Sequence, residues 1–285
     1  MGPAAADAIP ALIEAAEDDS SKIGSHARDA IEQIGIQNTR NIEGLKELMS
    51  HSDRDVREKV IEALGFIGPV AIEAGDALLG ALNDPDRLVR HAAIKSSGRV
   101  LPDFRAVPIL EGMLKRGQVG VNEEIINSIA NFLPESDLAL GAIIRTLEYD
   151  RDTGEDAVNA LVAVGPKVVP ALIDALDNGN KNIRINSARA LGSIGVDAGD
   201  SVPKLIVTLD DLDSEVRVEA ANALGGIGAP SANALPRLRE ISERDNYVDI
   251  RSLQHTVRRA AREAIERIEI AIGSPIEEAG DEDGV

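Results

Sequence analysis

The four histidines of the chain, His26, His51, His91 and His255, are the side chains best suited to hold a metal ion. A helical zinc site needs two histidines four residues apart, and no such pair occurs. The sequence has no cysteine, which excludes thiolate metal sites, thiol nucleophiles and disulfide bonds. It also lacks the G-x-S-x-G and P-loop motifs. We therefore expect no metal site, no cofactor and no catalytic residue, and hence a protein that is not an enzyme.

A recurrent arginine is the second feature that could carry chemistry. It follows an aliphatic or small residue at Arg57, Arg90, Arg184, Arg217 and Arg258. One interpretation is a row of phosphate contacts. The other is a structural ladder of ion pairs to the aspartates that cap the helices of adjacent repeats. We favour the ladder, because it requires the same position at the same register in successive elements.

The arginines belong to an internal repeat. Val56-Arg57 precedes Ala63-Leu64-Gly65-Phe66-Ile67-Gly68, and similar segments begin at Ile183 and Val216. Weaker copies begin at Ile23, Val89, Val121, Thr153 and Val257, so the intervals are 33, 33, 32, 32, 30, 33 and 41 residues.

Each copy predicts two helices. In the first helix, apolar or small residues at +4, +7, +8 and +11 from the start of the copy form one stripe. Capping residues precede it at Ser20, Asp53, Asp86, Asp150, Asn180 and Asp213, and a glycine ends it at Gly35, Gly68, Gly165, Gly195 and Gly228. The second helix is expected to open on a proline, at Pro10, Pro108, Pro170, Pro203 and Pro236.

Neither helix can bury its apolar stripe alone, so neighbouring pairs must stack into a continuous core. The sequence therefore predicts an all-α fold, an α-solenoid of antiparallel helix pairs. We expect a single domain over residues 1–272 with about eight repeats. Residues 1–19 form a half-repeat and 245–272 an irregular cap, and residues 273–285 are expected to be a disordered acidic tail.

The motif Asp-x-x-Val-Arg-x-x-Ala-x-x-Ala-Leu-Gly-x-Ile-Gly resembles the HEAT repeat, in the short form named after phycobilisome lyases. The resemblance covers roughly residues 2–270. It implies a superhelical stack like those of HEAT and armadillo proteins. Its implications for function are broad, since the family includes scaffolds, lyases, hydroxylases and DNA-repair enzymes.

The composition is strongly acidic. Asp and Glu number 49 against 30 Lys and Arg, which gives a net charge of −19. With 22 Arg against 8 Lys and only 2% aromatic residues, the chain is typical of a halophilic archaeon, whose salt screens the self-repulsion. The negative charge disfavours nucleic acid and anionic lipid as partners. We expect a cytoplasmic monomer that does not contact a membrane.

Solenoids of this kind usually bind partners on their concave face, which the second helices line in this family. The positions at +1, +4, +5 and +8 from the proline are expected to face outward there. The predicted partner-binding residues are Ile109, Met113, Arg116, Arg145, Tyr149, Asp174, Lys204, Thr208, Arg237 and Glu240. Small residues in the middle and arginines toward the C-terminus predict a protein or peptide partner with an apolar stripe and some negative charge.

The leading hypothesis is a non-enzymatic scaffold or adaptor for protein–protein interaction. One alternative is a phycobilin lyase-type enzyme, as in the namesake of the subfamily. Another is a HEAT-type protein associated with nucleic acid. A narrower possibility is a chemotaxis or motility adaptor of salt-loving archaea.

Overall fold

The computed structural model describes residues 39–116, 122–133, 135–149, 151–243 and 253–273, with a few single positions before residue 39. These residues form α-helices and 3-10 turns, and they contain no strand. The predicted all-α solenoid class is thus confirmed. Most of the predicted half-repeat 1–19, the segment 245–252 and all but the first residue of the predicted tail lie outside the described residues.

The chain divides into two compact units, residues 1–142 and 143–285, and we describe each by itself. The expectation of a single domain over residues 1–272 stays a prediction. The first unit contains α3 (Thr39–Leu48), α4 (Arg54–Ile67), η2 (Gly68–Ala74), α5 (Gly75–Ala81), α6 (Arg87–Val100), α7 (Asp103–Lys115), α8 (Asn122–Ala130) and most of α9 (Asp137–Thr146). The second contains α10 (Arg151–Val164), η3 (Gly165–Val168), α11 (Val169–Ala175), α12 (Lys181–Ile194), η4 (Gly195–Ser201), α13 (Val202–Thr208), α14 (Ser214–Ile227), η5 (Ala229–Ala234), α15 (Leu235–Glu243) and α16 (Leu253–Ala271).

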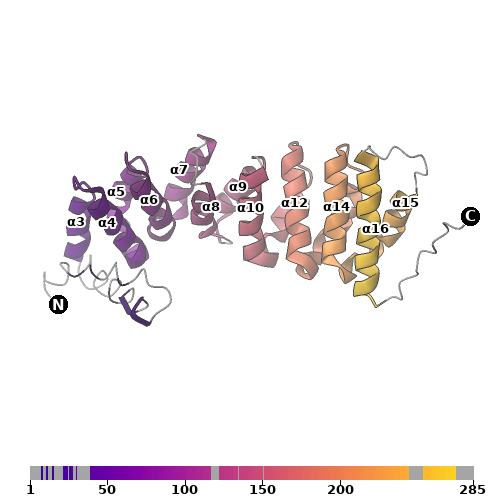
Figure 1. The fold of residues 1–285 in the computed structure, drawn as a ribbon, viewed down its shortest axis with the longest axis horizontal. Helices are drawn as coiled ribbons and strands as arrows, with labels where there is room; N and C mark the ends of the chain where they lie inside the picture. The colour runs from indigo at the N-terminus through magenta and orange to yellow at the C-terminus, as the bar shows by residue number, and fades with distance from the viewer. Residues whose placement is uncertain are drawn as a thin grey trace, which may run out of the picture. The chain divides into compact units, whose positions relative to one another are not determined.

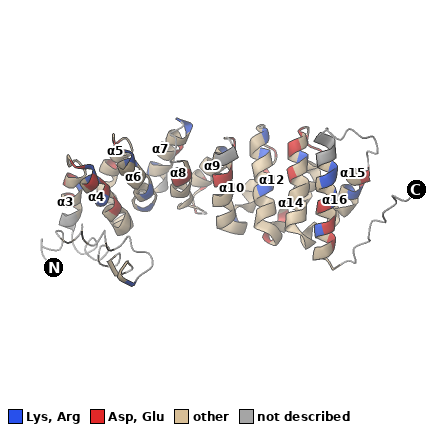
Figure 2. Cartoon of the chain, in the orientation of Figure 1, with Lys and Arg blue, Asp and Glu red and all other residues tan. Residues whose placement is uncertain are grey.

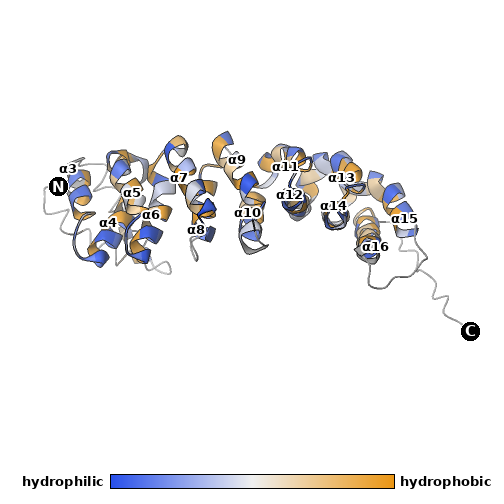
Figure 3. Ribbon diagram, turned by 90° about the horizontal axis from the view of Figure 1, so that it is seen from above, coloured by the Kyte–Doolittle hydropathy of each residue, from blue (hydrophilic) through white to orange (hydrophobic). Residues whose placement is uncertain are grey.

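The helices of each unit form two layers (Figure 1). We call the first helix of each repeat its A helix and the second its B helix. In the first unit the A helices α4, α6 and α8 pack on one another in chain order. In the second unit α10, α12, α14 and α16 do the same, and the B helices α11, α13 and α15 form the other layer (Figure 3). This is the stacking that the repeat predicts.

Most of the predicted helix boundaries that the structure describes are confirmed. The side chains of Asp53, Asp86, Asn180 and Asp213 each accept a hydrogen bond from a backbone N–H of the first helical turn. The helix-ending glycines Gly68, Gly165, Gly195 and Gly228 have φ angles of 70°, 79°, 76° and 73°, which side chains other than glycine rarely adopt. A 3-10 turn then reverses the chain toward the B helix.

One predicted boundary is wrong. Pro108 does not open its helix, because α7 begins five residues earlier, at Asp103. This repeat has Leu101 where five other copies have the glycine, and Leu101 is extended with φ −91° and ψ 147°. The extended Leu101 and Pro102 replace the 3-10 turn, so α7 starts directly after them and Pro108 lies inside it.

Small residues let the A helices approach closely. A Cβ atom at Gly192 would lie 2.7 Å from Cα of Ala223 on the next A helix, and one at Gly226 would lie 2.5 Å from the carbonyl oxygen of Gly192. In the first unit the hydroxyl of Ser96 donates to the carbonyl of Ile61, 2.8 Å away on the preceding A helix. The scarcity of aromatic residues thus has a structural reason.

Two stretches, Arg54–Ala81 and Thr153–Ala175, have the length and hydropathy of a membrane span. Neither is a continuous helix. Each contains a 3-10 turn that begins at a glycine with positive φ, Gly68 in one and Gly165 in the other. Each stretch is therefore one antiparallel A–B pair of the solenoid.

Candidate interaction surfaces

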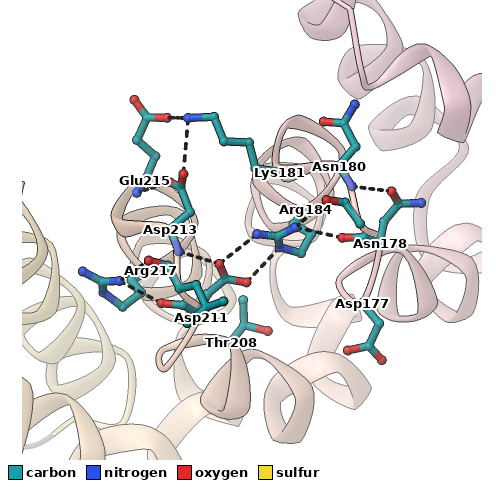
Figure 4. A network of polar contacts seen from close by, with 12 residues as sticks. Asp177, Asn178, Asn180, Lys181, Arg184, Thr208, Asp211, Asp213, Glu215 and Arg217 are labelled. Carbon is teal, nitrogen blue, oxygen red and sulfur yellow. Dashed lines mark hydrogen bonds and ion pairs between the residues drawn. The ribbon is translucent and has the colours of Figure 1, made fainter.

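Arg184 of α12 forms a clamp between two successive repeats (Figure 4). Its Nε and Nη2 atoms donate to the two carboxylate oxygens of Asp211 at 2.8 and 2.9 Å. Its Nη1 donates to the backbone carbonyls of Asn178 and Gly179 at 2.8 and 3.3 Å. Asp211 in turn accepts from the backbone N–H of Asp213, the cap of α14, at 2.8 Å. One guanidinium therefore fixes the loop before its own helix and the loop before the next.

The first unit repeats this clamp. Arg57 donates to both carboxylate oxygens of Asp84 at 2.9 and 3.0 Å and to the carbonyls of His51 and Ser52. Burial alone would raise the pKa of Asp84. Hydrogen bonds from Arg57 and from the backbone N–H of Asp86 outweigh that effect, and the pKa of Asp84 lies below its usual value.

Two of the five arginines of the predicted ladder, Arg57 and Arg184, form ion pairs between repeats, and their acceptor differs from the prediction. The arginine pairs with an aspartate two residues before the cap, and the cap itself pairs with the first residue of the preceding A helix. Arg54 contacts the cap Asp86 at 3.3 Å, and Lys181 contacts the cap Asp213 at 3.3 Å.

Two other arginines of the series, Arg90 and Arg217, donate only to backbone carbonyls in the contacts that the structure describes. Arg90 donates to the carbonyls of Asp84 and Pro85, and Arg217 to those of Asp211 and Leu212. The guanidinium groups of the ladder are thus directed into the loops. The phosphate interpretation gains no support from this geometry.

The outward side of the B helices in the second unit carries a second ladder. Lys204 of α13 pairs with Asp177, which follows α11, and Arg237 of α15 pairs with Asp210, which follows α13. Arg237 also contacts Glu240. Three of the predicted partner-binding residues, Lys204, Arg237 and Glu240, therefore form ion pairs within the chain.

These pairs change the expected charge of the surface. We define the B face as Asp174, Asp177, Lys204, Val207, Asp210, Arg237 and Glu240. It holds four carboxylates and two cations, both cations in ion pairs. The prediction that this surface favours a negatively charged partner is therefore not supported, since an acidic segment would meet an excess of acid there.

Val207 is the apolar centre of the B face. It is 64% exposed, and it lies at the same register as Asp174 on α11 and Glu240 on α15, 33 residues away in each direction. The acidic residues on both sides make an apolar side chain at this place unusual. The sequence pattern contained Val207 as an outward position, and the ten predicted contact residues omitted it.

Two predicted contact residues are buried. Met113 is 0% exposed, and Thr208 is 6% exposed with its hydroxyl bonded to the carbonyl of Lys204 at 2.9 Å. Both lie at +5 from the proline, three residues after the core positions Leu110 and Leu205. Since residues three apart share a helix face, the +5 position turns inward. The expected exposure of Met113 and Thr208 is wrong for this reason.

The other predicted residues are accessible to different degrees. In the first unit Ile109 is half-buried and Arg116 is exposed. In the second unit Arg145 and Asp174 are exposed and Tyr149 is half-buried. Their role in binding a partner stays a prediction.

Among the described residues, no group of three or more His, Asp or Glu side chains is placed to hold a metal ion. His91 of α6 lies 2.8 Å from Glu124 of α8, Nε2 to Oε1. The two residues lie on neighbouring A helices, as do Arg189 of α12 and Glu219 of α14, which form an ion pair at 3.0 Å. The helix α12 carries Lys181, Arg184 and Arg189 and no acidic residue, which Figure 2 shows beside its neighbour α14.

The HEAT-repeat family model matches residues 42–130 and 169–266, which is more than half of the chain. The chain belongs to the HEAT-repeat family. No curated protein matches it in sequence.

Similar solved structures were also found. One is an engineered protein, 21% identical with a TM-score of 0.40, over 92% of this chain and 79% of that one. Human deoxyhypusine hydroxylase in complex with glycerol is 19% identical with a TM-score of 0.35, over 94% and 98%. A chain of the Kap95:Nup1 complex is 14% identical with a TM-score of 0.46, over 92% and 40%. At these identities the likeness concerns the fold alone.

Proposed function

We propose that this HEAT-repeat chain is a non-enzymatic scaffold that binds another protein through the B face of its second unit. The observation that carries the proposal is the exposed Val207 between two rows of charged residues whose cations are already paired. An apolar contact at the centre with charged residues around it is the usual composition of a protein-binding surface.

The second ladder, formed by the ion pairs of Lys204 and Arg237, supports this function because it makes the B face rigid. Lys204 and Arg237 each join two successive repeats, so the rows on α11, α13 and α15 are held in register before a partner arrives. A preorganised surface loses less conformational entropy on binding, which raises affinity. The acidic excess favours a partner that presents an apolar side chain flanked by Lys or Arg.

Photo-crosslinking identifies the partner and tests the surface. A benzophenone amino acid replaces Val207 on α13, and in a matched control it replaces the exposed Ser193 on α12. We expect one discrete protein adduct from position 207 that is absent from position 193. Equal labelling at both positions, or adducts with nucleic acid or a bilin pigment, would reject the proposal in favour of the other functions.

We further propose that the chain belongs to the phycobilisome-lyase-like class of HEAT repeats and functions as a monomer in the salt-rich cytoplasm of a halophilic archaeon. The repeat length of 30–33 residues and the Ala-Leu-Gly-x-Ile-Gly motif support the class. The net charge of −19 and the preference for Arg over Lys support the salt adaptation.

A further inference from the structure

A row of exposed apolar residues follows the turns that end the A helices of the second unit. We call it the turn edge and define it as Pro166, Val196, Ala229, Pro230 and Ile272. Val196 is 65% exposed and Ile272 is 41% exposed, and the other three are exposed as well. Four of the five follow a glycine of positive φ by one or two residues, and Ile272 directly precedes such a glycine.

The members of the row come from adjacent turns. A Cβ atom at Gly199 would lie 3.3 Å from Cβ of Pro230, which places η4 against η5. A Cβ atom at Gly228, which directly precedes η5, would lie 3.4 Å from Cβ of Ala271, and η5 itself contacts α16. The turn η3 likewise contacts η4. Each of the four successive repeats therefore contributes at least one apolar residue to this edge.

Negative charge at this edge comes from two sources, while the exposed Lys167 of η3, next to Pro166, supplies one cation. The helices α10, α12, α14 and α16 all end there, and none has a basic residue in its last turn. Each helix C-terminus carries a partial negative charge of about half an elementary charge. In addition, Asp197 and Asp200 of η4 are exposed. The charge distinguishes this edge from the opposite one, where arginines pair with the aspartates.

The spacing of the row restricts the conformation of a ligand. Packed helices lie about 8–10 Å apart, and the small-residue contacts here place them toward the lower end of that range. A polyproline II helix rises about 3.1 Å per residue with three residues per turn, or about 9 Å per turn. A peptide in that conformation presents one side chain per repeat to the edge.

We propose that the turn edge binds a basic peptide segment in the polyproline II conformation, with an apolar residue at every third position and Lys or Arg between. The apolar residues contact Val196, Pro230 and Ile272 in turn. The basic residues face Asp197, Asp200 and the helix C-termini. At low salt a second copy of this chain is a poor occupant, because two chains of net charge −19 repel each other.

The test uses a fluorescent peptide that repeats Leu-Lys-Pro, measured by anisotropy against the full chain. A peptide that repeats Ser-Lys-Pro has the same charge without the large apolar residue, and one that repeats Leu-Glu-Pro has the opposite charge. We expect the first to bind at least about tenfold more tightly than either control, a difference of about 1.4 kcal/mol. Equal binding of the Leu-Lys-Pro and Ser-Lys-Pro peptides would overturn the proposal, because it would show attraction to the acidic chain as a whole.

Paired variants locate the binding. The substitutions Val196→Lys and Ile272→Lys together are expected to weaken Leu-Lys-Pro binding at least about tenfold. The matched control, Leu88→Lys with Leu212→Lys, adds the same charge at two exposed apolar positions outside the turn edge and outside the B face, and is expected to leave the affinity within about twofold. Equal losses in both variants would overturn the site. A dimeric wild type that the first variant converts to a monomer would assign the edge to self-association instead.

Discussion

Arg184 and Asp211, which are 27 residues apart in the chain, meet through two parallel N–H···O bonds of 2.8 and 2.9 Å across successive repeats. Arg57 and Asp84 repeat the relationship 127 residues earlier, with the same number of residues between them. The bidentate geometry matches the planar guanidinium fork, which lysine cannot reproduce. It gives one reason why arginine outnumbers lysine in this chain.

The Arg184 clamp makes a measurable contribution to stability. Replacing Arg184 by Met removes the partner of Asp211 and of two loop carbonyls, and we expect a loss of about 1–3 kcal/mol in the free energy of unfolding. Urea denaturation followed by circular dichroism measures it. The control Arg259→Met removes an exposed pair with Glu263 at 3.5 Å on α16 and is expected to cost less than about 0.5 kcal/mol. Equal losses of stability in the two variants would show that the clamp contributes no more than an exposed ion pair.

The Asp84 clamp predicts a pH dependence of stability. The pKa of Asp84 in the folded chain is below its unfolded value of about 3.9, so its carboxylate stabilises the fold above that pH. This contribution is lost as the pH falls through the folded-state pKa. We therefore expect the stability difference between wild type and Asp84→Asn to be constant from about pH 7 to 5 and to narrow below about pH 4. A difference that stays constant to pH 3 would contradict the assigned pKa direction.

The close approach of the A helices predicts opposite effects of two glycine-to-alanine substitutions. Gly226→Ala places a methyl group 2.5 Å from the backbone oxygen of Gly192, and we expect a loss of about 1–3 kcal/mol. Gly80→Ala on α5 meets nothing within 4 Å and is expected to gain about 0.5–1 kcal/mol from the helix propensity of alanine. Thermal melts of the two variants measure both changes. A stable Gly226→Ala variant would mean that the helices lie further apart.

The acidic composition predicts stabilisation by salt. Molar KCl screens the repulsion among the excess carboxylates, so the melting temperature is expected to rise by several degrees or more relative to low salt. Potassium chloride at matched ionic strength should act like sodium chloride if screening is the cause. No rise in melting temperature would contradict the proposed adaptation to a salt-rich cytoplasm.

Much of the fold could be predicted from the sequence, because the signals are local. The caps at Asp53 and Asp213 and the terminating glycines act within one helical turn, and their roles are visible in the motif. The start of α7 was missed because it depends on Leu101. Without a glycine at this position no 3-10 turn forms, and the following proline does not mark the start of the helix.

The charge of the interaction surface was harder to predict from the sequence, because it depends on which charged side chains form ion pairs. The outward direction of Lys204 and Arg237 followed from the helix period, whereas their pairing with Asp177 and Asp210 requires the geometry of neighbouring repeats. A search for opposite charges 27 residues apart would have found these pairs and the Arg184–Asp211 clamp. The burial of Met113 could also have been predicted, since it lies one helical turn from Leu110.

The affinity of the crosslinked partner for chains altered at Val207 tests the scaffold function most directly. Titration calorimetry compares wild type with Val207→Asp on the B face and with Ser193→Asp on α12, which adds the same charge at an exposed position of the A layer. We predict that Val207→Asp weakens the partner at least about tenfold, while Ser193→Asp stays within about twofold of wild type. Equal affinities for the two variants would contradict binding through the B face.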